Sequence, residues 1–207
     1  MSLAMSAPEV RFEGLEDTPA VKVKGKFFFL GEQKFFIKGV TYGPFRPAAH
    51  GAPFPDKWFV ERDFALMAEM GANVIRTFTV PPEWLLDLAA VHNLRVMVGI
   101  PWPQHVCFLD SASMRAEIRR TIAASVRACK DYPAAFAYLV GNEIPPDIVR
   151  WHGAKRIREF LYELFEVAKE AKPEALVSYA NFPSTEYLGI DFTDFLAFNV
   201  YLHRQED

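Results

Sequence analysis

Cysteine is scarce in this sequence, with two residues among 207. Cys107 and Cys129 do not have the spacing of metal ligands, and two cysteines do not indicate a disulfide framework. Cys129 continues the apolar positions of a predicted helix, so packing in the core accounts for it.

An excess of positive charge is also lacking, since 23 Lys and Arg stand against 26 Asp and Glu and the formal net charge is −3. Nucleic-acid-binding proteins usually carry a basic stripe, so we expect no nucleic-acid partner. The apolar run FFFL at residues 27–30 is far too short to cross a membrane. The opening residues MSLAMSAPEV lack the continuous apolar segment of a secretory signal. We therefore expect a cytoplasmic protein without a membrane segment in this chain, although a domain of a larger secreted or membrane protein would look the same.

What the sequence does contain is a large apolar fraction in alternating strand and helix patterns. With 51% hydrophobic residues, the chain can bury the core of one globular domain. KFFFL and KFFIKGV, on either side of Gly31-Glu32-Gln33, predict an N-terminal β-hairpin. We assign residues 1–24 to an N-terminal extension and residues 25–207 to the folded domain. Six further strands, alternating with amphipathic helices, are predicted near residues 36–42, 73–79, 95–101, 136–142, 176–181 and 195–201.

Strands and helices that alternate in this way predict a parallel sheet covered by helices, either an open doubly wound sheet or a TIM barrel. An open sheet that binds a nucleotide usually has a glycine-rich first turn, and residues 39–55 contain neither GxGxxG nor a P-loop. Nearly every predicted strand ends instead in a polar or aromatic residue, and in a barrel these ends meet at one mouth. The strand-end residues are Tyr42, Arg76, Trp102, Asn142, Glu143, Asn181, Asn199 and Tyr201. We therefore predict an α/β fold of the (β/α)8 TIM-barrel type, with an N-terminal hairpin and truncated after its sixth strand.

The order of three motifs resembles glycoside hydrolases of clan A, with families two and five the nearest. FFIKGVTYG follows the first hairpin strand, GANVIRTF comes next, and GNE ends the fourth barrel strand. The resemblance implies that Glu143 is the catalytic acid/base and that Asn142 donates to the sugar 2-hydroxyl. It also implies that Arg76 supports the nucleophile and that Tyr201 contacts it, although Arg76 pairing with a helix carboxylate is the alternative.

Four more residues are expected to line the substrate pocket. His105, after the third strand, resembles a histidine of the sugar pocket in this clan. Trp102 can stack on a sugar ring at the mouth or pack under a loop, and the sequence leaves both readings open. Tyr42 and Asn181 are expected at the mouth because they end strands. We expect neither a metal nor another cofactor.

Glycoside cleavage in this clan uses two carboxylates, one that protonates the leaving oxygen and one that attacks the sugar. The resemblance places the nucleophile at the end of a seventh strand, which we expect beyond Asp207. Adjacent residues of a strand point to opposite faces. Asn142 and Glu143 can therefore both face the mouth only if their strand ends in a bulge or a twist.

The sequence thus predicts a retaining glycoside hydrolase or transglycosidase that acts on a β-linked oligo- or polysaccharide with Glu143 as general acid/base. The alternative is a non-catalytic carbohydrate-binding barrel that lacks the strand-seven nucleophile. A third hypothesis is a different TIM-barrel enzyme that uses Glu143 as a proton-transfer base, with or without a metal. It is weaker because no cluster of Asp, His and Glu recurs at the other strand ends. The sugar, the linkage and the oligomeric state are not specified by the sequence.

Overall fold

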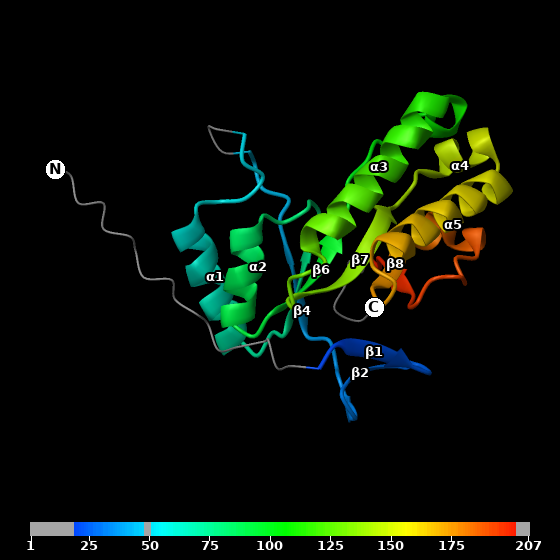
Figure 1. Cartoon of the computed structure of the whole chain (residues 1–207). Coiled ribbons are helices and arrows are strands. Elements are labelled where there is room, and N and C mark those ends of the chain that lie inside the picture. Colours follow the sequence, from blue (N-terminus) through cyan, green and yellow to red (C-terminus); the bar gives the residue numbers. More distant parts are fainter. Residues whose placement is uncertain (1–18, 48–50, 202–207) are drawn as a thin grey trace.

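The computed structural model of the protein describes residues 19–47 and 51–201. Their strands form two sheets, one of three antiparallel strands and one of six parallel strands. Figure 1 shows the helices arranged around the parallel sheet and the antiparallel sheet projecting at one end of it. None of the described helices is long and apolar enough to cross a bilayer.

The antiparallel sheet contains the predicted hairpin and one strand more. β2 (Phe27–Leu30) pairs with β3 (Gln33–Lys34) as predicted, and also with β1 (Val21–Lys24), in a register that places Val21 opposite Leu30. Residues 21–24, which we assigned to the N-terminal extension, pair with β2 through their backbone. The rest of the predicted extension, residues 1–18, lies outside the described residues.

The parallel sheet contains all six predicted barrel strands. Each strand pairs in parallel with the next one along the chain, so the order is sequential from β4 to β9. A doubly wound sheet reverses its strand order at a switch point, whereas a TIM barrel does not. The sheet is therefore a curled part of a TIM barrel, as predicted. Its strands are β4 (Gly39–Tyr42), β5 (Val74–Thr77), β6 (Arg95–Gly99), β7 (Ala135–Asn142), β8 (Leu176–Asn181) and β9 (Ala197–Phe198).

Helices alternate with the parallel strands, as predicted. Ser111 caps α3, because its Oγ accepts a hydrogen bond from Met114 N at 3.2 Å. Val60 and Phe64 of α1 are buried, whereas Met70 at its C-terminal end is 77% exposed. The helices are α1 (Lys57–Glu69), α2 (Glu83–Val91), α3 (Ala112–Cys129), α4 (Pro146–His152) and α5 (Ala154–Ala171), with 3-10 turns η1 (Phe108–Asp110) and η2 (Pro183–Leu188).

Two apolar clusters hold these layers together. The larger one lies between the helices and the parallel sheet. The smaller one joins Val21 of β1 to Val74 and Phe136, at the amino ends of β5 and β7, and Phe28 of β2 packs edge-on against Phe136. The antiparallel sheet therefore covers the amino ends of the parallel strands and leaves their carboxyl ends free for a site.

Candidate active site

Strand β7 ends in a bulge, and Asn142 and Glu143 follow from it. Leu139 pairs with Ser178 and Asn142 with Ala180, so three steps along β7 match two along β8. Glu143 then adopts the left-handed conformation, with φ of +51°. The extra residue and the left-handed turn bring both side chains to the same hydrogen-bond network. The strand therefore ends in the bulge that the sequence analysis required if both side chains are to face the mouth.

The backbone after this bulge is fixed by three consecutive N–H groups. A non-glycine residue in the left-handed region costs on the order of 1 kcal/mol, so the conformation persists only where its surroundings hold it. Tyr179, one of the three acceptors, is 2% exposed, and burial raises the pKa of its phenol, which keeps the hydroxyl neutral. The three bonds run from Asn142 N to Gln104 Oε1 (2.9 Å), from Glu143 N to Ala180 O (2.9 Å) and from Ile144 N to the Tyr179 hydroxyl (2.7 Å).

Gly141 lies between two aromatic side chains behind the bulge. A Cβ at this position would lie 3.2 Å from atoms of both Trp102 and Tyr179. Trp102 is 8% exposed and donates from Nε1 to Val140 O at 2.7 Å, with Phe108 packed edge-on against it. Of the two readings left open for Trp102, the structure therefore supports packing under a loop.

Arg76 organises the side chains at the mouth. Its Nη1 donates to Asn199 Oδ1 at 2.7 Å and its Nη2 to Asn142 Oδ1 at 2.6 Å. Because a guanidinium can only donate, both amides must turn their oxygens toward it. The Asn199 Nδ2 group consequently donates to Glu143 Oε1 at 2.6 Å, and to Asn142 Oδ1 at 3.0 Å. The Tyr201 hydroxyl donates to the same Glu143 oxygen.

The electrostatics of this network concern its two main hydrogen-bond donors, the Arg76 guanidinium and the Tyr201 hydroxyl. Burial lowers the pKa of the Arg76 guanidinium, and the Glu143 carboxylate opposes that effect. The guanidinium also lies over the Phe78 ring, 5.0 Å from its centroid. The hydrogen bond to Glu143, followed by burial, raises the pKa of the Tyr201 hydroxyl, so Tyr201 stays a neutral donor.

Six of the predicted site residues share this region. Arg76, Asn142, Glu143 and Tyr201 belong to the network just described. His105 and Trp102 line a cavity of about 230 Å³ next to it, together with Arg76 and Asn142. The resemblance implied that Tyr201 contacts the nucleophile, whereas in the structure its hydroxyl bonds Glu143.

The structure does not bring Tyr42, Trp102 or Asn181 into the network. Tyr42 is 4% exposed, and its hydroxyl donates to Asp63 of α1 at 2.9 Å. Asn181 is 7% exposed, and its amide bonds the backbone and hydroxyl of Thr185 in η2. Our placement of Tyr42 and Asn181 at the mouth was wrong, because Tyr42 bonds α1 and Asn181 bonds η2 instead of projecting from the strand end. Trp102 stays beside the mouth, where it lines the cavity with Arg76 and Asn142, but its indole donates to the β7 backbone.

Three residues of the site were not predicted as site residues from the sequence. Asn199 had been noted as a strand-end residue, and its spacing of two from Tyr201 is the signal that both share a face. Gln104 and Tyr179 act through long-range bonds to the β7 backbone, and no local pattern indicates such bonds.

Solved structures that resemble this chain are TIM-barrel glycosidases. A Bacteroides uniformis β-glucuronidase matches with a TM-score of 0.69 at 22% identity, over 85% of this chain and 22% of that one. Saccharomyces cerevisiae Gas2p, solved in complex with laminaripentaose, matches with a TM-score of 0.61 at 20% identity, over 81% of this chain and 41% of its own. The fold is that of a clan A glycoside hydrolase, as the motifs indicated.

Within that clan, the chain belongs to glycoside hydrolase family 72, the glucanosyltransferases, whose family model matches residues 11–181. The family is thus neither two nor five. Curated relatives include the 1,3-β-glucanosyltransferase gel1 of Aspergillus fumigatus, 24% identical over 97% of this chain and 48% of its own length. GAS5 of Saccharomyces cerevisiae is 22% identical over 75% of this chain and 34% of its own. The chain spans half or less of the length of these relatives.

The expected cytoplasmic location was wrong. The matched relatives are fungal glucanosyltransferases of the cell wall, secreted or anchored outside the cell, and none of them is cytoplasmic. The opening residues alone misled the sequence reasoning on this point.

Proposed function

We propose that this chain carries the acid/base half of a β-1,3-glucanosyltransferase site, with Glu143 as the acid/base. Glu143 protonates the glycosidic oxygen as the donor glucan is cleaved, and then takes the proton of the incoming acceptor hydroxyl. Family membership and the names of the relatives support this reaction. The observation that carries the assignment to Glu143 is the convergence of two donors on one of its oxygens at the carboxyl end of β7.

The pattern of hydrogen bonds indicates which oxygen of Glu143 carries the proton. Asn199 Nδ2 and the Tyr201 hydroxyl both donate to Oε1. An oxygen that accepts two hydrogen bonds is the unprotonated one, because a carboxylic acid donates through its other oxygen. In the proposed reaction Oε2, the oxygen without these two bonds, is the one that passes the proton to the glycosidic oxygen of the substrate.

Asn142 contributes the second contact to the sugar. Its Oδ1 is occupied by Arg76 and Asn199, so its Nδ2 group is the part left to bind a ligand. A hydrogen bond to the sugar 2-hydroxyl strengthens as the oxocarbenium-like transition state forms. Arg76 thereby acts through the two amides, and the chemistry of the site depends on its two-pronged geometry.

Retaining chemistry also needs a nucleophile carboxylate about 5–5.5 Å from the acid/base. Among the described residues, the hydrogen bonds around Glu143 include no second carboxylate. In the proposed reaction the nucleophile comes from the strand after β9 in the barrel order, as the resemblance to clan A implies. Transfer then differs from hydrolysis only in the acceptor, a glucan hydroxyl in place of water.

The test uses the whole protein that carries this chain and β-1,3-gluco-oligosaccharides as substrate. We expect products longer than the substrate, which chromatography with mass spectrometry resolves. Glu143→Gln should abolish transfer from the natural oligosaccharide and retain more of the first step on an aryl β-glycoside, whose leaving group needs little protonation.

Glu163→Gln is the matched control, since Glu163 forms a surface ion pair with Arg119 and should leave both rates unchanged. Equal losses on natural and activated substrates would show that Glu143 is not the acid. Binding of oligosaccharide without any turnover would support the carbohydrate-binding alternative instead.

A further inference from the structure

The cavity of about 230 Å³ beside the Glu143 network contains a residue to which the proposed mechanism gives no contact with the substrate. Gln104 follows the carboxyl end of β6 and lines this cavity together with Arg76 and Asn142. A turn holds Gln104 in place, because its backbone N–H donates to the Trp102 carbonyl at 2.8 Å. Gln104 is half-buried, so part of its side chain is open to a ligand.

The hydrogen bond between Gln104 and the β7 backbone determines which end of its amide is free. Gln104 Oε1 accepts from Asn142 N at 2.9 Å. A backbone N–H can only donate, so the oxygen faces β7 and the Nε2 group is the other end of the amide. Within residues 19–47 and 51–201, Nε2 has no acceptor, and it is not one of the buried atoms that lack a partner. Its two N–H groups are therefore available to a ligand.

The amide of Asn142, which lines the same cavity, is oriented in the same way. Its Oδ1 accepts from Arg76 Nη2 at 2.6 Å and from Asn199 Nδ2 at 3.0 Å, so its Nδ2 group is the free end. Arg76 supplies no acceptor, because a guanidinium can only donate. These side chains therefore present hydrogen-bond donors to the cavity, and a ligand that binds them must supply acceptor oxygens.

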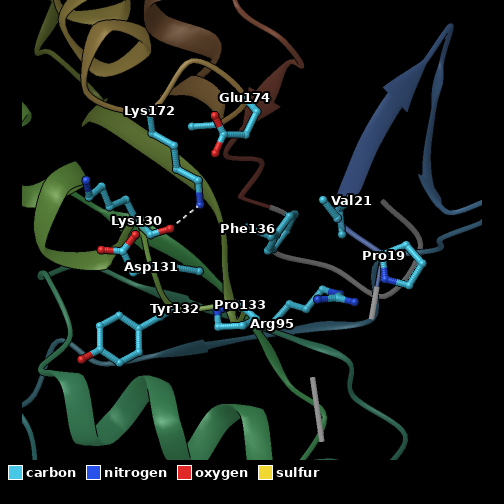
Figure 2. Close-up of a pocket in the computed structure, with 13 residues that line it drawn as sticks. Pro19, Val21, Arg95, Lys130, Asp131, Tyr132, Pro133, Phe136, Lys172 and Glu174 are labelled. Atoms are coloured by element: carbon cyan, nitrogen blue, oxygen red, sulfur yellow. Dashed lines mark hydrogen bonds between the residues drawn. The ribbon is translucent and has the colours of Figure 1, made fainter. Parts of the chain in front are cut away.

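The charges around this cavity favour a neutral ligand. None of the described residues that line it is Asp or Glu, and the Arg76 guanidinium already uses Nη1 and Nη2 on two amide oxygens. The donors that remain on Gln104 and Asn142 are neutral amides, which match the hydroxyl oxygens of an uncharged sugar. Figure 2 shows a cavity of a different kind at the amino ends of β6 and β7, where the lining carries charges of both signs: Arg95, Lys130, Asp131, Lys172 and Glu174.

We propose that Gln104 is a substrate-binding residue, whose Nε2 donates a hydrogen bond to a hydroxyl oxygen of the glucosyl unit that Asn142 also binds. This inference rests on the proposed function and adds a second amide to the same sugar. The bond from Asn142 N to Gln104 Oε1 joins the two residues, so their free N–H groups keep a fixed spacing. Polar groups at a fixed spacing orient a ligand and select it by the positions of its hydroxyls.

The test is a crystal structure of the whole protein that carries this chain, with Glu143→Gln, in complex with a β-1,3-gluco-oligosaccharide. We expect a hydroxyl oxygen of the sugar about 2.7–3.2 Å from Gln104 Nε2. Calorimetric titration of the same protein measures the affinity, and adding Gln104→Met, which removes the amide at similar length, should weaken binding by about 2- to 13-fold. Gln33→Met is the matched control, because Gln33 is exposed in the antiparallel sheet and should leave the affinity unchanged.

An oligosaccharide bound at position 143 with no sugar oxygen within hydrogen-bond distance of Gln104 Nε2 overturns the inference and leaves the proposed function standing. Equal affinities with and without Gln104→Met do the same. A residue that only held the Asn142 backbone would also weaken binding when replaced, but in the complex its Nε2 would face solvent, and that result overturns the inference too. If the Glu143→Gln protein binds no oligosaccharide, the proposed function fails, and this inference fails with it.

Discussion

Replacing Arg76 by lysine tests whether the mouth depends on a two-pronged donor. Lysine keeps the positive charge but is a point donor, so it cannot hold Asn142 and Asn199 as Arg76 does, at 2.6 and 2.7 Å. Once one amide is free to flip, its oxygen can face the Glu143 carboxylate, and the 2.6 Å bond from Asn199 Nδ2 is lost. The Glu143 side chain stays in place, but the arrangement of the hydrogen-bond donors around it is disturbed.

The size of the effect follows from that one bond. A hydrogen bond to a charged group contributes about 1.5–3 kcal/mol, which corresponds to a decrease in kcat/KM of about 10- to 150-fold. The free energy of unfolding should fall as well, because an ammonium is more strongly hydrated than a guanidinium and costs more to bury. Initial rates on β-1,3-gluco-oligosaccharides and a thermal melt measure the two quantities separately.

Arg119→Lys is the matched control, because Arg119 pairs with Glu163 at the surface and its change should leave kcat/KM as it was. If a folded Arg76→Lys protein works within threefold of the unmodified protein, the amides do not depend on Arg76, and the reasoning about their orientation fails.

Two further predictions concern the backbone that supports the site. Tyr179→Phe removes the acceptor of the buried Ile144 N–H, so we expect a loss of about 1–3 kcal/mol in urea unfolding and a lower kcat; unchanged kcat would show that Tyr179 does not position Glu143. Gly99→Ala places a Cβ 2.3 Å from the Thr77 carbonyl oxygen, which should cost about 3 kcal/mol. Gly39→Ala is its control, with the nearest atoms at 3.5 Å, and equal losses in the two variants would contradict the steric explanation.

The barrel strands were predictable because a strand that is buried on both faces has apolar residues on both faces, and this pattern is visible in the local sequence. β6 and β8 are almost wholly buried and read as largely apolar runs in the sequence, RVMVG and LVSYAN. β1 was missed because VKVK alternates, and its outward lysines make it look like part of a polar extension. Met70 illustrates the opposite case, because it is an apolar residue at helical spacing from Leu66 and yet faces away from the core.

The site was predictable only as far as strand ends define it. Arg76, Asn142 and Glu143 follow from the strand positions and from the resemblance to clan A. Whether a strand-end side chain points to the mouth or to a helix depends on the twist at that end, and this is why Tyr42 and Asn181 were misplaced. The sequence showed that β7 must end in a bulge or a twist, but it did not show that the bulge follows Leu139.

At position 143, the left-handed backbone conformation sets thermal stability against the proposed catalytic role of the side chain. A glycine would adopt a φ of +51° without the steric cost of a Cβ, about 1 kcal/mol, but it would have no carboxylate. Where the relief of backbone strain exceeds the loss of the two hydrogen bonds to that carboxylate, a mutant library screened only for heat resistance would lose the proposed acid/base, whereas a screen for product would retain it. Stabilising this protein without inactivating it thus requires that position 143 be held constant from the start.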